Sequence, residues 1–312
     1  MRNLLVLCIM VACLSGCQDF MSTLQGLFQS TPPHTPTEAM EVKRLKVNHT
    51  ELAYVEDGEG DTVVFVHGAS GDWRTWEGLR PFIAQKYHYI ALSRRYHYPN
   101  SWSDEGQHYS LTQHVEDVAA FIRRLDVGKV HLVGGSYGGR VAGYVALKYP
   151  ELVRSVVMSD PDIIDPTTAQ GVAALLDYQK DVAKSSAAAK AGDSWEASMR
   201  LYDAVLDDPG AFLHAPIVQQ QRWLDNADTV PLMLAAKPPR PPSCEQLVAL
   251  KVPALVMSGE KSRAVFKYSN KKLLDCLPKG TETAVVPDAP HLWYPVNPKA
   301  GAREILAFLA EH

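Results

Sequence analysis

The chain has 312 residues, of which 46% are apolar and 21% charged, a composition typical of one large folded domain. Its formal net charge is −4, and no basic stripe runs along it, which argues against a nucleic-acid partner and against a polybasic contact with anionic lipid. None of its five cysteines stands with histidines or carboxylates at metal-ligand spacing, so no metal site is expected.

The chain begins with a short positive and then apolar segment. Residues 4–14 follow Arg2 as an apolar run that is too short to span a bilayer comfortably, and Leu14-Ser15-Gly16-Cys17 ends the segment. This pattern resembles a bacterial lipoprotein signal, which is cut before a cysteine that then carries lipid. An ordinary secretory signal with a chance cysteine is the alternative. The resemblance implies loss of residues 1–16, a membrane anchor on Cys17, and a location in the cell envelope, at the outer membrane or the periplasmic face.

Residues 17–41 are interpreted as a tether, because the stretch from Ser30 to Thr37 is dominated by proline and threonine and cannot pack a core. In an exported protein, Cys244 and Cys276 would meet an oxidising compartment. They either form one disulfide or stay apart, with Cys276 in a buried apolar position.

Short apolar or alternating runs predict eight strands, at 43–48, 51–55, 62–66, 88–92, 129–133, 154–159, 253–258 and 282–286. The central runs are almost wholly apolar, as expected of parallel strands covered by helices on both faces. Helical patterns lie between them, the clearest at 111–125, after 136 and from about 298. This alternation predicts a doubly wound, mostly parallel α/β sheet with an antiparallel strand at its start.

Residues 162–242 interrupt the alternation. They contain helical patterns at 172–176, 195–206 and 218–224 and no convincing strand, and they are far longer than a single crossover requires. We therefore expect a core made of residues 42–161 and 243–312, with 162–242 inserted as a helical cap above the active site. Ordinary crossover helices are the alternative.

A glycine-rich turn joins the fifth strand to the next helix. Residues 134–138 read Gly-Gly-Ser-Tyr-Gly, in which glycines let neighbouring backbones approach while the serine is held in a strained bend. This turn looks like the nucleophile elbow of the α/β-hydrolase superfamily, a resemblance that covers about residues 43–312. It implies an α/β-hydrolase fold with Ser136 as the nucleophile.

Two further segments occur in the order of that family. Val66-His67-Gly68-Ala69 resembles its His-Gly loop, which implies an oxyanion hole made by the backbone N–H groups of Ala69 and Tyr137, with His67 bracing the loop. His291 lies between the last strand and the terminal helix, where the family places its general base, although Pro290 replaces the usual glycine.

The acid of the triad departs from the commoner family pattern. After strand 253–258 the chain reads Gly259-Glu260-Lys261-Ser262, so a serine stands where the aspartate is expected, and a serine cannot stabilise an imidazolium by charge. Asp160, at the end of strand 154–159, is the favoured substitute, and Glu260 is the alternative. Without a catalytic role, Asp160 would be a turn residue before Pro161.

Loops at the expected edge of the site carry aromatic and basic residues. Arg94 and Arg95 either receive a carboxylate-bearing substrate or brace neighbouring loops. The residues predicted to bind substrate are Trp73, Arg95, Tyr96 and Trp293.

The resemblance implies a serine hydrolase that cleaves a small-molecule ester or a related acyl bond, such as a lactone or activated amide, through an acyl-enzyme without a cofactor. A serine nucleophile argues against dehalogenase and epoxide hydrolase chemistry. The alternatives are a carbon–carbon bond hydrolase of ring-cleavage products, a peroxidase-like side activity, and a lipoprotein that only binds because its triad has decayed. The natural substrate and the oligomeric state have no signal in the sequence.

Overall fold

The computed structural model describes residues 40–237 and 239–312, so the predicted signal segment, Cys17 and nearly all of the tether lie outside the described residues. The described part of the chain contains one eight-stranded sheet in the order β1-β2-β4-β3-β5-β6-β7-β8. β2 pairs antiparallel with both β1 and β4, and all other neighbours are parallel. The strands are β1 Lys43–Val47, β2 Thr50–Asp57, β3 Thr62–Val66, β4 His88–Leu92, β5 Val130–Gly135, β6 Val153–Ser159, β7 Ala254–Gly259 and β8 Glu282–Val286. The predicted fold class is confirmed.

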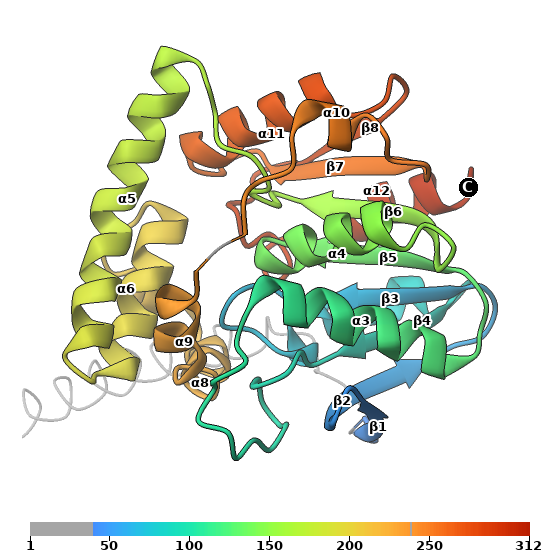
Figure 1. Cartoon of the computed structure of the whole chain (residues 1–312), viewed down its shortest axis with the longest axis horizontal. Coiled ribbons are helices and arrows are strands. Elements are labelled where there is room, and N and C mark those ends of the chain that lie inside the picture. Colours follow the sequence, from blue (N-terminus) through green and yellow to red (C-terminus); the bar gives the residue numbers. More distant parts are fainter. Residues whose placement is uncertain (1–39, 238) are drawn as a thin grey trace, which may run out of the picture. The chain divides into compact units, whose positions relative to one another are not determined.

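Helices cover both faces of this sheet (Figure 1). On one face lie α3 (Leu111–Leu125), α4 (Tyr137–Lys148), α10 (Cys244–Leu247) and α11 (Ala264–Cys276). On the other lie the short η1 (Trp73–Trp76), α2 (Arg80–Ile83) and the terminal α12 (Pro298–Leu309). No helix of residues 40–312, with 238 left aside, is both long and apolar enough to cross a membrane.

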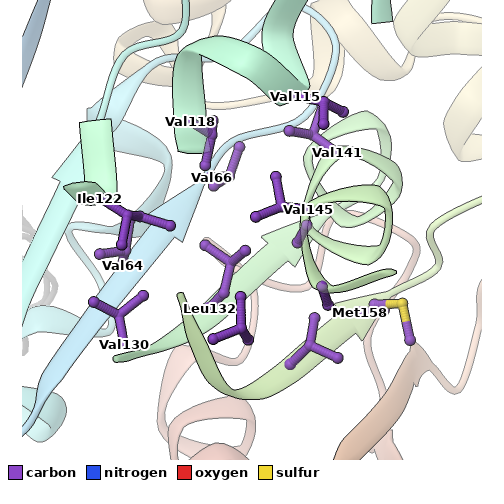
Figure 2. Packing of buried hydrophobic residues seen from close by; sticks show 14 of the residues in the cluster. Val64, Val66, Val115, Val118, Ile122, Val130, Leu132, Val141, Val145 and Met158 are labelled. Carbon is purple, nitrogen blue, oxygen red and sulfur yellow. The ribbon is translucent and has the colours of Figure 1, made fainter. Parts of the chain in front are cut away.

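The two faces of the sheet are packed differently. Figure 2 shows the aliphatic face, where valines of β3 and a valine and a leucine of β5 meet valines and an isoleucine of α3 and α4. The opposite face is aromatic: the Phe65 ring centroid lies 5.2 Å from that of Trp76, which in turn lies 4.5 Å from that of Tyr294. All of these side chains are buried, and β3 contributes to both layers, with Val64 and Val66 on the aliphatic face and Phe65 on the aromatic face, as its nearly continuous apolar sequence predicts.

Between β6 and α10 the described residues contain five helices and no strand: α5 Ala169–Lys190, α6 Ser194–Leu206, α7 Ala211–His214, α8 Ile217–Leu224 and α9 Thr229–Ala235. Figure 1 shows these helices gathered at one end of the sheet. They form the segment in which a cap was expected.

A buried arginine ties these helices to the sheet domain. Arg263, next to the start of α11, donates from Nη2 to Asp177 (2.7 Å) and Asp181 (2.8 Å) of α5, and its Nε lies 3.3 Å from Asp207. The three carboxylates have a spacing that would suit a cation. Because the Arg263 guanidinium contacts all three carboxylates, we interpret this cluster as an ionic connection between these helices and the sheet domain.

Cys244 of α10 and Cys276 at the end of α11 form a disulfide. The bond fixes the segment that returns from the helical insertion onto α11. The sequence left this pairing open, and the structure resolves it.

Candidate active site

Ser136 stands in a strained bend between β5 and α4. Its backbone has φ 53° and ψ −124°, a left-handed φ that a non-glycine residue adopts only when its surroundings enforce it. The flanking glycines allow this bend, because a Cβ at Gly134 would lie 2.2 Å from the Gly138 carbonyl oxygen and one at Gly138 would lie 2.1 Å from that of Val66. The Ser136 N–H is tied to the Ser159 carbonyl at 2.7 Å. The expected elbow geometry is therefore present.

The loop after β3 lies directly against this serine. A Cβ built on Gly68 would come within 3.3 Å of Ser136 Cβ. The amide of Tyr137 opens α4, where backbone N–H groups have no partner within the helix. Among the described residues, the amides of Ala69 and Tyr137 donate to no other backbone carbonyl. Both predicted oxyanion donors are thus free beside Ser136.

Arg94 supports the loop of His67, Gly68 and Ala69 that follows β3. Its Nη2 donates to the carbonyl oxygens of Gly68 (2.7 Å) and Ala69 (3.2 Å), and its Nε donates to that of His67 (3.3 Å). The guanidinium carbon lies 4.7 Å from the ring centroid of Tyr137. A side chain that is only 1% exposed thus contacts both residues whose amides are predicted to form the oxyanion hole.

His67 also helps to hold this loop in place. Its Nε2 accepts from the Arg94 N–H at 2.9 Å, and its Nδ1 lies 2.9 Å from the Gly68 carbonyl oxygen. Burial, together with the positive charge of Arg94, holds the pKa values of His67, His97 and His114 well below the usual range. All three rings are therefore neutral at neutral pH.

His291 is completely buried and held in place from two sides. Its Nδ1 lies 3.2 Å from Asp160 Oδ2, and its ring stacks on Phe266 with 3.9 Å between centroids. Nε2 is also buried and has no hydrogen-bond partner among the described residues, so it is not bonded to Ser136 Oγ in this state. A buried ring nitrogen without a partner is an unusual arrangement that a reacting hydroxyl would satisfy.

Asp160 is the carboxylate that contacts the histidine. It lies at the end of β6, is fully buried, and accepts from Ser262 Oγ at 2.6 Å and from Asn270 Nδ2 at 2.7 Å in addition to its contact with His291. Ser262 occupies the position of the usual family acid and here donates to its substitute. A negative charge in this site is well stabilised, because each oxygen of the carboxylate has a donor.

Glu260 is oriented differently. Its side chain is exposed, and Oε2 accepts from the amide of Asp288 at 2.8 Å. The structure therefore brings Asp160, and not the alternative acid, to the imidazole.

Two cavities meet at Ser136. The first, which we call the small cavity, has a volume of about 50 Å³, and the second, the charged cavity, about 330 Å³. Ser136, Ala69, Leu201 and Val205 border both. The small cavity is also lined by Tyr202, Trp223, Leu292 and Tyr294, and the charged cavity by Tyr137, Arg140, Asp162, Tyr178, Lys237 and Phe266.

The four side chains expected to bind substrate line neither cavity. Trp73 and Trp293 are buried, and the Trp293 indole donates to Ser159 Oγ at 2.8 Å. Arg95 and Tyr96 border a separate groove near β1, where Arg95 forms a two-pronged ion pair with Asp117. Their positions give no support to a role in binding substrate at Ser136, and Arg94 and Arg95 both brace the fold.

Other site residues had little or no signal in the sequence. Asn270, in the middle of α11, has no motif that would associate it with Asp160. Arg140 stands one turn after Ser136, so its place at the site follows from helix geometry once the elbow is identified.

Comparison with known proteins agrees with this architecture. A family model described as alpha/beta hydrolase fold matches residues 61–298. A 2-(acetamidomethylene)succinate hydrolase of Mesorhizobium japonicum is 33% identical over 118 residues, which cover 38% of this chain and 42% of that enzyme. The chain thus spans less than half the length of this relative.

Two longer similarities were found. A Mycobacterium tuberculosis protein that carries the name non-heme bromoperoxidase is 27% identical over 273 residues, 83% of this chain and 97% of its own. A crystal structure of a membrane phospholipase A, described as a bacterial virulence factor, has the same fold, with a TM-score of 0.70 and 22% identity over 99% of this chain and 98% of its own. Because the family match covers well over half of the sequence, the protein belongs to the α/β-hydrolase fold family.

Proposed function

We propose that the protein is a serine-dependent hydrolase of a small ester or a related acyl bond, such as a lactone or activated amide. The observation that carries this proposal is the buried Asp160–His291 pair. His291 Nε2 has no hydrogen-bond partner among the described residues, and the ring stacks on Phe266, which lines the same cavity as Ser136. The Ser159 carbonyl accepts from the Ser136 amide, and Ser159 is the immediate neighbour of Asp160. The end of β6 therefore positions both Ser136 and Asp160.

The residues would act in two steps. Ser136 Oγ attacks the carbonyl carbon while His291 Nε2 takes its proton, and Asp160 stabilises the imidazolium that results. The amides of Ala69 and Tyr137 receive the negative oxygen of the tetrahedral intermediate. The imidazolium then protonates the leaving group, and a water activated by His291 releases the acyl group from Ser136.

The small cavity favours a short group on one side of the scissile bond, since its volume of about 50 Å³ has room for few heavy atoms. Its lining contains no charged side chain in the described part of the chain. The two cavities together leave space for both halves of a small ester around Ser136.

A panel of substrates tests this proposal. It contains p-nitrophenyl esters from acetate to octanoate, a lactone and a vinylogous diketone, each assayed with the wild type and with Ser136→Ala. We expect short esters to be hydrolysed best and Ser136→Ala to lower kcat by at least about 10³-fold. Ester hydrolysis that is unchanged in Ser136→Ala would refute the proposal. Preferential cleavage of the diketone would favour carbon–carbon bond hydrolysis.

We further propose that Cys17, which lies outside the described residues, carries a lipid anchor in the bacterial cell envelope. The sequence Leu14-Ser15-Gly16-Cys17 supports this anchor. The disulfide between Cys244 and Cys276 is compatible with it, because such bonds are typical of oxidising compartments. Cys17→Ser should stay unprocessed and incorporate no labelled palmitate. Lipid incorporation or a membrane fraction equal to that of the wild type would contradict the anchor.

A further inference from the structure

The two cavities at Ser136 differ in charge. The described lining of the small cavity is uncharged, whereas that of the charged cavity includes Arg140, Lys237 and one acid, Asp162. Since Ser136 borders both, the two halves of a substrate bound there would meet different environments. This asymmetry bears on which substrates the site selects.

Arg140 is well placed to contact a bound molecule. Its backbone N–H donates to the Ser136 carbonyl at 3.0 Å, so it lies one helical turn from the nucleophile. Its Nη2 donates to Asp162, and this is its one side-chain hydrogen bond within the described residues. A guanidinium has five N–H donors, and the buried Nε of Arg140 has no acceptor. Most of its hydrogen-bonding capacity is therefore unused.

Lys237 adds a second positive charge at the rim of the same cavity. It follows α9, is exposed, and forms no ion pair with the residues that the structure describes. Two cations and one carboxylate leave the lining with a net positive charge. An anionic group would gain from both cations, whereas a neutral acceptor would form only weaker hydrogen bonds with Arg140.

We propose that the substrate carries a carboxylate on the half that occupies the charged cavity, where Arg140 binds it and Lys237 reinforces the attraction. This inference rests on the proposed function, because it assigns a specificity to the same Ser136 site. The other half of the substrate, in the small cavity, is short and uncharged. A planar guanidinium suits this role, since it can bind a carboxylate through two parallel N–H donors.

Two matched substrate pairs test the proposal. In one, the acyl group of a nitrophenyl ester ends in a carboxylate or in the carboxamide of the same length; in the other, the phenol of an acetate ester carries the carboxylate or the carboxamide. We expect the wild type to prefer the carboxylate member of one pair by about 10- to 100-fold in kcat/KM, the range of a charge-assisted hydrogen bond.

The variants remove the proposed contacts, and the first is a double variant so that Asp162 is not left as a charge without its partner. Arg140→Gln/Asp162→Asn neutralises both members of the ion pair and should reduce the preference, mainly through KM, to the several-fold that Lys237 alone supports. Lys237→Gln should reduce it several-fold. Arg200→Gln is the matched control, because Arg200 pairs with Glu196 on the outer side of α6 and borders neither cavity. It should keep the full preference.

The outcomes separate the two proposals. Absence of a carboxylate preference in both pairs, or a preference as large in the double variant as in the wild type, overturns this inference while neutral esters are still hydrolysed through Ser136. Hydrolysis that persists in Ser136→Ala overturns the proposed function itself.

Discussion

Replacing Asp160 by asparagine keeps the size of the side chain and removes its negative charge. In the structure the carboxylate is fully buried and accepts from Ser262, Asn270 and His291 at 2.6, 2.7 and 3.2 Å. An asparagine retains one acceptor oxygen and places an NH₂ group where one of these donors now points. The imidazole then loses both its charge partner and the hydrogen bond that selects its tautomer.

We expect kcat of Asp160→Asn toward an activated ester to fall by about 10³- to 10⁴-fold, equivalent to about 4–5.5 kcal/mol of transition-state stabilisation. Urea unfolding accompanies the assay, because loss of buried hydrogen bonds also lowers stability by about 1–3 kcal/mol. Glu260→Gln is the control: its exposed carboxylate binds the Asp288 amide, and activity should change by less than about threefold. A large loss in Glu260→Gln with little loss in Asp160→Asn would refute the assignment of the acid.

Three further changes have defined outcomes. Cys244→Ser/Cys276→Ser removes a crosslink between residues 32 positions apart in the sequence, which should lower the free energy of unfolding by about 3–4 kcal/mol. Urea titrations measure this change, and an unchanged urea midpoint would show that the crosslink is not stabilising. Burial depresses the pKa values of His67, His97 and His114, so below pH 6.5 the unfolded chain binds protons that the folded chain does not. The free energy of unfolding should therefore decrease as the pH falls below 6.5, by up to about 1.4 kcal/mol per pH unit for each ring. His114→Leu replaces a ring that has no hydrogen bond to any residue the structure describes, so it should make that slope shallower by one proton. An unaltered slope would exclude His114 as its source. Arg94→Met should lower kcat by about 10- to 100-fold with KM nearly constant, since the loop that carries the Ala69 amide loses its support; a change in KM alone would contradict this role.

The sheet was accessible from the sequence because its central strands are short apolar runs bounded by turns. All eight predicted strands occur, and only their ends shift, as with β2, which extends to Asp57 rather than residue 55. The short helices α7 and α9 were not separated from the surrounding pattern, because four to seven residues carry too little periodicity.

The site was predictable where local chain geometry or the family order of segments determines it, as with Ser136, His291 and Asp160. Ser136 depends on a bend made by neighbouring glycines, so sequence spacing is informative there. The position of Arg95 depends instead on Asp117, a partner 22 residues away on α3, and that of Trp293 on Ser159, 134 residues away. Such long-range partners leave no periodic signal, which explains why the expected pocket residues line neither cavity.

The central claim is that Ser136 is a nucleophile activated by His291, and covalent labelling tests it most directly. The protein is treated with a fluorophosphonate, digested, and the adduct is located by mass spectrometry in the wild type, Ser136→Ala and His291→Ala. We predict one adduct on the peptide that contains Ser136, none in Ser136→Ala, and labelling slowed by at least about 10³-fold in His291→Ala. An adduct on another residue, or equal labelling of Ser136→Ala, would contradict the account.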